Sequence, residues 1–139
     1  MNPPPHAGEV TVDVLFTGHD ATRTGAPLMF LYFLRWLREH TDLTFELVLV
    51  DGGPLVEDFA EVAPVTVLAD LPVGRLDAVL AGLGLTGLAA QRRRRREQAA
   101  LRHVRSAPVV YCNSGSSIMV VPLLATDVPD RVVITHVHE

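Results

Sequence analysis

The residues from position 17 to position 27 combine side chains that bind anions with side chains that transfer protons. The residues of interest in this segment are His19, Asp20, Arg23, Gly25, Ala26 and Pro27. A glycine lets the backbone approach a ligand closely, and proline suits the first turn of a helix. The unpaired N–H groups at the start of a helix attract anions. The segment is therefore predicted to be an anion-binding turn, and a purely structural strand-to-helix connection is the alternative.

Two regular elements must position this turn. Residues 10–16 are rich in β-branched side chains and predict a strand. Residues 28–40 have the spacing of an amphipathic helix, with Met29 and Phe33 on the same wide apolar face as Phe30. In a sheet with helices on its faces, ligands bind beyond the carboxyl ends of the strands. The turn is therefore expected at the ligand-binding edge of such a sheet.

Strands and helices alternate along the rest of the chain. Further strands are predicted at residues 45–50, 65–68, 108–112 and 132–135. Helices are predicted up to residue 60, between residues 74 and 105 with an interruption at Gly82–Gly87, and after the polar turn at residues 113–117. This alternation predicts a doubly wound α/β fold with a mostly parallel sheet of about five or more strands. The apolar runs in the strands at 45–50, 108–112 and 132–135 predict burial on both faces.

The composition of the chain bears on its cellular compartment and on the partners that it binds. Residues 1–8 are expected to be a disordered, proline-rich lead-in without the features of a signal peptide, and residues 9–139 to be one Rossmann-like domain. The single cysteine, Cys112, lies in an apolar strand, which predicts a buried structural thiol and a reducing compartment. A net charge of −4 argues against nucleic acid as a partner. A cytoplasmic protein is expected, with peripheral membrane binding as a further hypothesis.

Two common phosphate-binding motifs are excluded. The P-loop motif requires a lysine, and all 12 basic residues of this chain are arginine. The dinucleotide fingerprint requires three closely spaced glycines, but the first turn has only Gly18 and Gly25. Asp51 follows the second strand as a ribose-binding acid would, but without the glycines it is more simply the first residue of a tight turn with Gly52 and Gly53, and NAD binding is disfavoured. A serine nucleophile at residues 113–117 lacks the usual Gly-x-Ser-x-Gly motif.

A histidine pair lies close to the end of the sequence. On an extended strand His136 and His138 point to the same side, as two ligands of a metal site would. No other cluster of ligands has suitable spacing, so no metal is predicted, and a metal-dependent hydrolase is kept as an alternative. In the other interpretation His138 faces the cleft, where it orients a hydroxyl group or acts as a base.

Five consecutive arginines, Arg92 to Arg96, fall within a predicted helix. At about 100° per residue they surround the helix and cannot share one face. They are either a solvated surface or a site that docks on anionic lipid or on a phosphorylated acceptor.

Together these features resemble the N-terminal domain of retaining glycosyltransferases of the GT-B fold, group 1 (family 4). The resemblance is carried, in order, by His19-Asp20-Ala21, Arg23 to Pro27, Asp51 to Leu55, Tyr111 to Ser114 and Ile134 to Glu139. In this family the N-terminal domain holds mainly the acceptor, and a C-terminal domain holds most of the nucleotide-sugar donor, so residues 9–139 are expected to be the acceptor-side domain. The sequence ends at the carboxyl end of a predicted strand, so we expect the C-terminal domain, with its Glu-x₇-Glu motif, to be missing.

The resemblance also assigns roles to residues. It implies that Gly25 and Ala26 contact the donor diphosphate, and that His138 lies near the transferred sugar as the catalytic candidate. His19, Arg23 and Asn113 are expected to face the acceptor or a phosphate. The implied partners are a nucleotide sugar and a hydroxyl acceptor (a glycan, a lipid-linked molecule or a small molecule), with no cofactor. The fragment alone is expected to be inactive. A stand-alone binding or partner module remains the alternative function.

Overall fold

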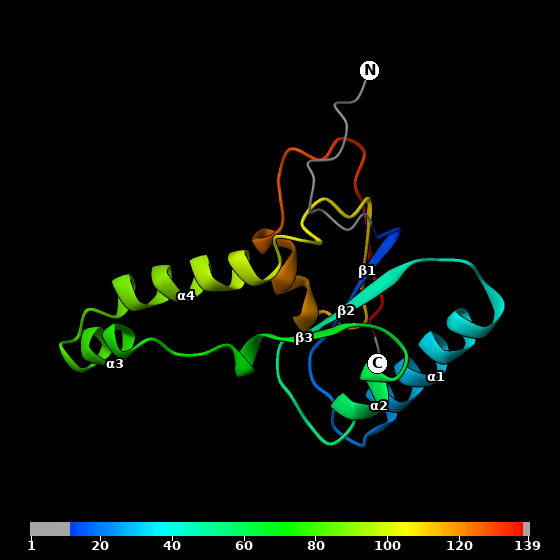
Figure 1. Ribbon diagram of the computed structural model, residues 1–139, viewed down its shortest axis with the longest axis horizontal. Coiled ribbons are helices and arrows are strands. Elements are labelled where there is room, and N and C mark those ends of the chain that lie inside the picture. The colour runs from blue at the N-terminus through cyan, green and yellow to red at the C-terminus, as the bar shows by residue number, and fades with distance from the viewer. Residues whose placement is uncertain (1–11, 138–139) are drawn as a thin grey trace.

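The computed structural model describes residues 12–137 and contains a five-stranded, all-parallel sheet between helices (Figure 1). The strands are β1 (Val14–Gly18), β2 (Phe45–Leu49), β3 (Val65–Val67), β4 (Val109–Cys112) and β5 (Val132–Thr135). The helices are α1 (Gly25–His40), α2 (Val56–Ala60), α3 (Arg75–Gly82) and α4 (Thr86–Ala100), with 3₁₀ helices η1 (Leu68–Asp70) and η2 (Ser116–Leu123). The predicted α/β fold with a parallel sheet is confirmed.

The order of the strands across the sheet is β3-β2-β1-β4-β5. The chain therefore builds outward from β1 to β3, crosses back, and continues on the other side with β4 and β5. The carboxyl ends of β1 and β4 lie at the point where this direction reverses. Such a switch point is where doubly wound folds form their ligand crevice.

Side chains that alternate along the strands form two apolar cores, one on each face of the sheet. On one face Phe16 and Leu47 pack against Phe30 and Leu34 of α1. The opposite core includes Leu15, Val48, Leu101, Val110 and Val120. Met29 and Phe33, which were predicted to share the buried face of α1, are instead 64% and 39% exposed, because the buried stripe is centred on Phe30, Leu31, Leu34 and Leu37.

The first strand begins later than predicted. Val12 and Asp13 precede β1, and residues 10 and 11 lie outside the described part of the chain. The ladder with β2 sets these bounds, because it pairs Val14 with Phe45 and Gly18 with Leu49. A Cβ atom on Gly18 would lie 2.9 Å from Leu49 Cδ2, so this glycine allows close packing at the end of the strand.

The predicted burial of the last strand is wrong. Val132, Val133 and Ile134 are 42–51% exposed, because β5 is an edge strand that pairs with β4 on one side only. β2 is mostly buried, and β4 is buried at every second residue. Cys112 at the end of β4 is fully buried, which confirms the prediction of a buried thiol.

Two predicted helices differ in form from the prediction. The helix after the polar turn is the 3₁₀ helix η2, which contains Pro122 and therefore lacks one donor for regular α-helical bonding. Residues 74–100 form a helical hairpin, the α3–α4 arm, that extends away from the sheet (Figure 1). Its two helices are separated at residues 83–85, within the glycine-containing stretch where an interruption was predicted. Among residues 12–137, no helix is long and apolar enough to cross a membrane.

Candidate functional site

Backbone hydrogen bonds join the turn after β1 to the loop after β2. The Asp51 N–H donates to the His19 carbonyl oxygen at 2.7 Å, and the Ala21 N–H donates to the Gly52 carbonyl oxygen at 3.2 Å. The Leu55 N–H donates to the Ala21 carbonyl oxygen at 2.9 Å. Residues 51–55 therefore support the turn at residues 19–22 as a neighbouring wall of the crevice.

Gly53 makes this close contact possible. Its φ is +152°, a conformation that glycine adopts and L-residues rarely do. A Cβ atom at this position would lie 2.5 Å from both the carbonyl carbon and the oxygen of Ala21. The glycine predicted to serve a tight turn thus also brings the two loops into contact.

Asp20 folds the turn that leads to α1. Its Oδ1 accepts hydrogen bonds from the Thr22 N–H at 3.0 Å and from the Thr22 hydroxyl at 2.7 Å. Desolvation by burial raises the pKa of Asp20, but the two hydrogen bonds from Thr22 and the nearby His19 together hold it below 3.8. The carboxylate is therefore the form that the turn stabilises.

This turn should contribute to stability only while Asp20 is ionised. Because the pKa of Asp20 is lower in the folded protein, its contribution is complete above pH 3.8 and is lost as the pH falls through the folded value. We expect Asp20→Ala to lower the free energy of unfolding by about 1–2 kcal/mol at neutral pH, since two hydrogen bonds to a charged acceptor are lost. Urea unfolding of both proteins should show this difference shrinking below pH 3.8. The Asp20→Asn variant keeps an acceptor oxygen but lacks the charge. If both variants lost the same free energy of unfolding, relative to the unmodified protein, at every pH, the ionisation of Asp20 would not be the cause of the effect.

The start of α1, which follows the turn after β1, presents backbone donors. Thr24 precedes the helix in an extended conformation and forms no side-chain cap, and the first turn contains no acidic residue. The N–H groups of Gly25 and Ala26 have no partner within the helix, as the first residues of any helix do not. Gly25 is exposed, and a Cβ atom there would meet nothing within 4 Å. The helix start can therefore receive an anion.

Two of the predicted site residues, His19 and Asn113, follow neighbouring strands of the sheet. His19 follows β1 and is exposed, while Asn113 follows the neighbouring β4 and is 8% exposed. The Asn113 N–H donates to the Thr17 carbonyl oxygen at 2.9 Å, which ties the two strand ends together. Arg23 instead extends toward α2, with its guanidinium 3.9 Å from Asp58, although its side chain remains 67% exposed. The catalytic candidate His138 lies outside the described residues.

His136 extends the pairing of the last two strands. Its N–H donates to the Cys112 carbonyl oxygen at 2.8 Å, and its Nδ1 lies 3.0 Å from the Tyr111 hydroxyl. Burial raises the pKa of Tyr111, so the phenol stays protonated and is able to donate to the ring nitrogen. Within residues 12–137, no group of three or more His, Cys, Asp or Glu residues is placed to hold a metal ion.

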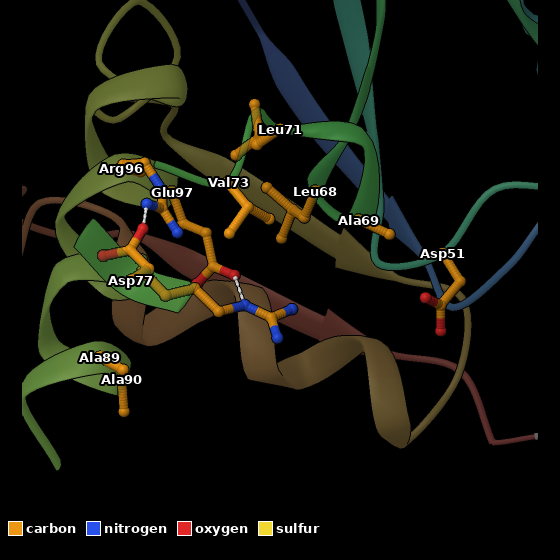
Figure 2. A pocket seen from close by; sticks show the side chains of 11 residues that line it. Asp51, Leu68, Ala69, Leu71, Val73, Asp77, Ala89, Ala90, Arg96 and Glu97 are labelled. Atoms are coloured by element: carbon orange, nitrogen blue, oxygen red, sulfur yellow. Dashed lines mark hydrogen bonds and ion pairs between the residues drawn. The ribbon is translucent and has the colours of Figure 1, made fainter. Parts of the chain in front are cut away.

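A cavity of about 550 Å³ lies between the α3–α4 arm and the carboxyl ends of β2 and β3. Figure 2 shows Asp77 and Arg96 facing each other on one side of it and Asp51 on the other. Apolar residues form much of the lining, namely Leu68, Ala69, Leu71, Val73, Ala89 and Ala90. Two ion pairs, Arg96–Asp77 and Arg93–Glu97, also line it. Since Asp51 also bonds to His19 through its N–H, the cavity adjoins the turn.

The arginine run surrounds α4, as predicted, and most of its members have partners in the protein. Arg92 and Arg96, one helical turn apart, both bind Asp77 of α3. Arg93 pairs with Glu97 at 2.8 Å, and Arg94 donates to the Pro122 carbonyl oxygen at 3.2 Å. The run is therefore partly a structural element that holds the arm together, a role that the sequence analysis did not include.

Two residues in this region were missed from the sequence. The Asx turn at Asp20 could have been found from its Asp-x-Thr pattern. Asp77 could have been found as the acid opposite Arg92 and Arg96, whose i, i+4 spacing places them on one helix face. The spacing of Arg92 and Arg96 alone does not show that the acid between them comes from α3.

Comparisons with protein-family models, with curated protein sequences and with solved structures found no significant match. The structure itself shows an α/β domain in which the polar turn, the start of α1 and the cavity follow the carboxyl ends of parallel strands.

Proposed function

We propose that this chain is the acceptor-side, N-terminal domain of a retaining glycosyltransferase that uses a nucleotide sugar. The observation that supports this function best is the switch point between β1 and β4, with His19 directly after β1, Asn113 directly after β4 and α1 as the next helix after β1. Ligands of doubly wound folds bind at this position. The adjoining cavity of about 550 Å³ has the size of a small-molecule site and could take an acceptor.

The proposed chemistry uses the start of α1 as an anion site. When the bond between the sugar and the nucleotide breaks, negative charge develops on the diphosphate. The N–H groups of Gly25 and Ala26 stabilise this charge because they are already oriented before the reaction, and the positive end of the helix dipole adds to the effect. Arg23, whose side chain is 67% exposed and lies 3.9 Å from Asp58, is proposed to turn toward the diphosphate when the donor binds. His138 remains the proposed group near the transferred sugar, and His19 and Asn113 are proposed to face the acceptor or a phosphate.

A substitution at Gly25 can remove one donor while keeping the helix. Proline is well suited to the first helical position, and Thr24 already has the extended conformation that a following proline requires. We therefore expect Gly25→Pro to remove the N–H group and to weaken binding of uridine diphosphate about tenfold, the effect of one hydrogen bond to a charged group. Titration followed by amide NMR measures the affinity and shows whether the resonance of Ala26 shifts.

The matched control is Gly25→Ala, which keeps the N–H group and places its Cβ atom in open space. Equal affinity of the proline and alanine variants would contradict an anion site at this helix start. The assignment of the chain as an acceptor-side domain has its own test. Turnover of a nucleotide sugar by the 139-residue chain alone would show that the donor site does not require a second domain.

A further inference from the structure

We propose that the tip of the α3–α4 arm inserts into the surface of an anionic lipid bilayer. The tip consists of the end of α3, the connection at residues 83–85 and the start of α4. Its exposed apolar side chains include Val79 at 55%, Leu83 at 69%, Leu85 at 45% and Leu88 at 51%. Figure 1 shows the arm extending away from the sheet, with the connection between α3 and α4 at its far end. This inference does not depend on the proposed glycosyl transfer.

The charge of the arm indicates an anionic partner. Residues 74–100 contain six arginines and only two acids, Asp77 and Glu97, in a chain whose net charge is −4. Both acids are bound by arginines of α4, so they offer little negative charge to repel a lipid headgroup. The arm is thus a positively charged projection on an acidic protein. Clustered arginines beside apolar side chains are typical of segments that bind anionic membranes.

The geometry favours insertion of the tip over docking along the helix. Because the arginines surround α4 and none of its residues is buried, this helix has no apolar face on which to lie in a bilayer. Measured along the helix, Arg92 lies about 9 Å and Arg96 about 15 Å from Thr86. Interfacial segments insert their apolar groups about 5–10 Å deep. A tip inserted to this depth would place the first arginines at the level of the lipid phosphates.

The test measures co-sedimentation of the full chain with vesicles of phosphatidylcholine containing phosphatidylserine. We expect binding that falls at least about tenfold on vesicles of phosphatidylcholine alone, since the electrostatic attraction is lost. The double variant Leu83→Ser/Leu85→Ser should also bind at least about tenfold more weakly, because two side chains no longer insert. Both positions are exposed, so the fold should be retained, and this is verified by circular dichroism.

Two further variants separate the contributions. Arg94→Gln/Arg95→Gln removes positive charge but spares Arg92 and Arg96, which hold Asp77, and should weaken binding to the anionic vesicles. Leu43→Ser removes an exposed leucine from the loop after α1, away from the arm in Figure 1, and should bind like the unmodified chain. Unchanged binding of the Leu83→Ser/Leu85→Ser variant would overturn the proposal. Equal binding to neutral vesicles, or no binding to either kind, would overturn it as well, and the second result would make a protein partner the better explanation for the exposed tip.

Discussion

Replacing Gly53 with alanine is expected to destabilise the protein by about 3 kcal/mol. An L-residue at a φ of +152° is strained, which costs on the order of 1–3 kcal/mol. The added Cβ atom would also lie 2.5 Å from the Ala21 backbone, and backbone cannot move aside as a flexible side chain can. Thermal unfolding should show a decrease in Tm of about 10 °C for a chain of this size.

Gly52→Ala is the matched control for this prediction. The neighbouring glycine has no positive φ, and a Cβ atom there would lie at an ordinary distance of 3.8 Å from Val67 Cγ1. We expect a change in Tm of no more than a few degrees. If both variants unfold at the same temperature, the contact between Gly53 and Ala21 does not carry the stability that we assign to it.

The second large effect is expected at Asp77, which joins the two helices of the arm. Its side chain is 7% exposed and binds Arg92 at 2.8 Å together with Arg96, and it also accepts a hydrogen bond from the Gly74 N–H at 3.2 Å. Removing one partner of a fully buried ion pair costs about 3–5 kcal/mol. Here Arg92 is 47% exposed and Arg96 is 29% exposed, so water can solvate them again. We therefore expect Asp77→Ala to cost a smaller amount, about 2 kcal/mol.

This loss should appear as local opening of the arm. Asp77 of α3 forms its ion pairs with Arg92 and Arg96 of α4, so the amides of α3 should lose most of their protection from hydrogen exchange while those of β1 and β4 keep theirs. Glu97→Gln is the control, because it removes an ion pair between residues on a single helix, worth about 0.5 kcal/mol. Unchanged protection of α3 in the Asp77→Ala variant would show that apolar contacts alone hold the hairpin.

The fold was predictable where local patterns agree with the global arrangement. Alternating strands and helices gave the parallel sheet, and the apolar run at residues 45–50 lies in its interior. The same kind of pattern gave a wrong prediction of burial at Val132, Val133 and Ile134. An apolar run shows the type of its side chains, but it does not show whether the strand lies inside the sheet or at its edge. Which strand becomes the edge is decided by pairing between residues far apart in sequence, here between β4 and β5.

The candidate site was predictable in part for the same reason. The glycines, the proline and the polar residues after β1 mark a turn by their own chemistry, and the turn is where they predict it. The contact between Gly53 and Ala21 could not be read from the sequence, since it depends on how two separate loops meet. The pairing of Arg92 and Arg96 with Asp77 likewise depends on how α3 folds back against α4.

The burial of Cys112 gives the protein a built-in chemical reporter of its own unfolding. Cys112 is the single cysteine of the chain, and it is fully buried at the end of β4, which lies between β1 and β5. Its thiol can therefore be alkylated only when the sheet opens. Alkylation should therefore be slow in the native protein and faster in the Gly53→Ala variant, whose whole domain is destabilised. The Asp77→Ala variant should be alkylated at nearly the native rate, because its arm can open while the sheet remains closed.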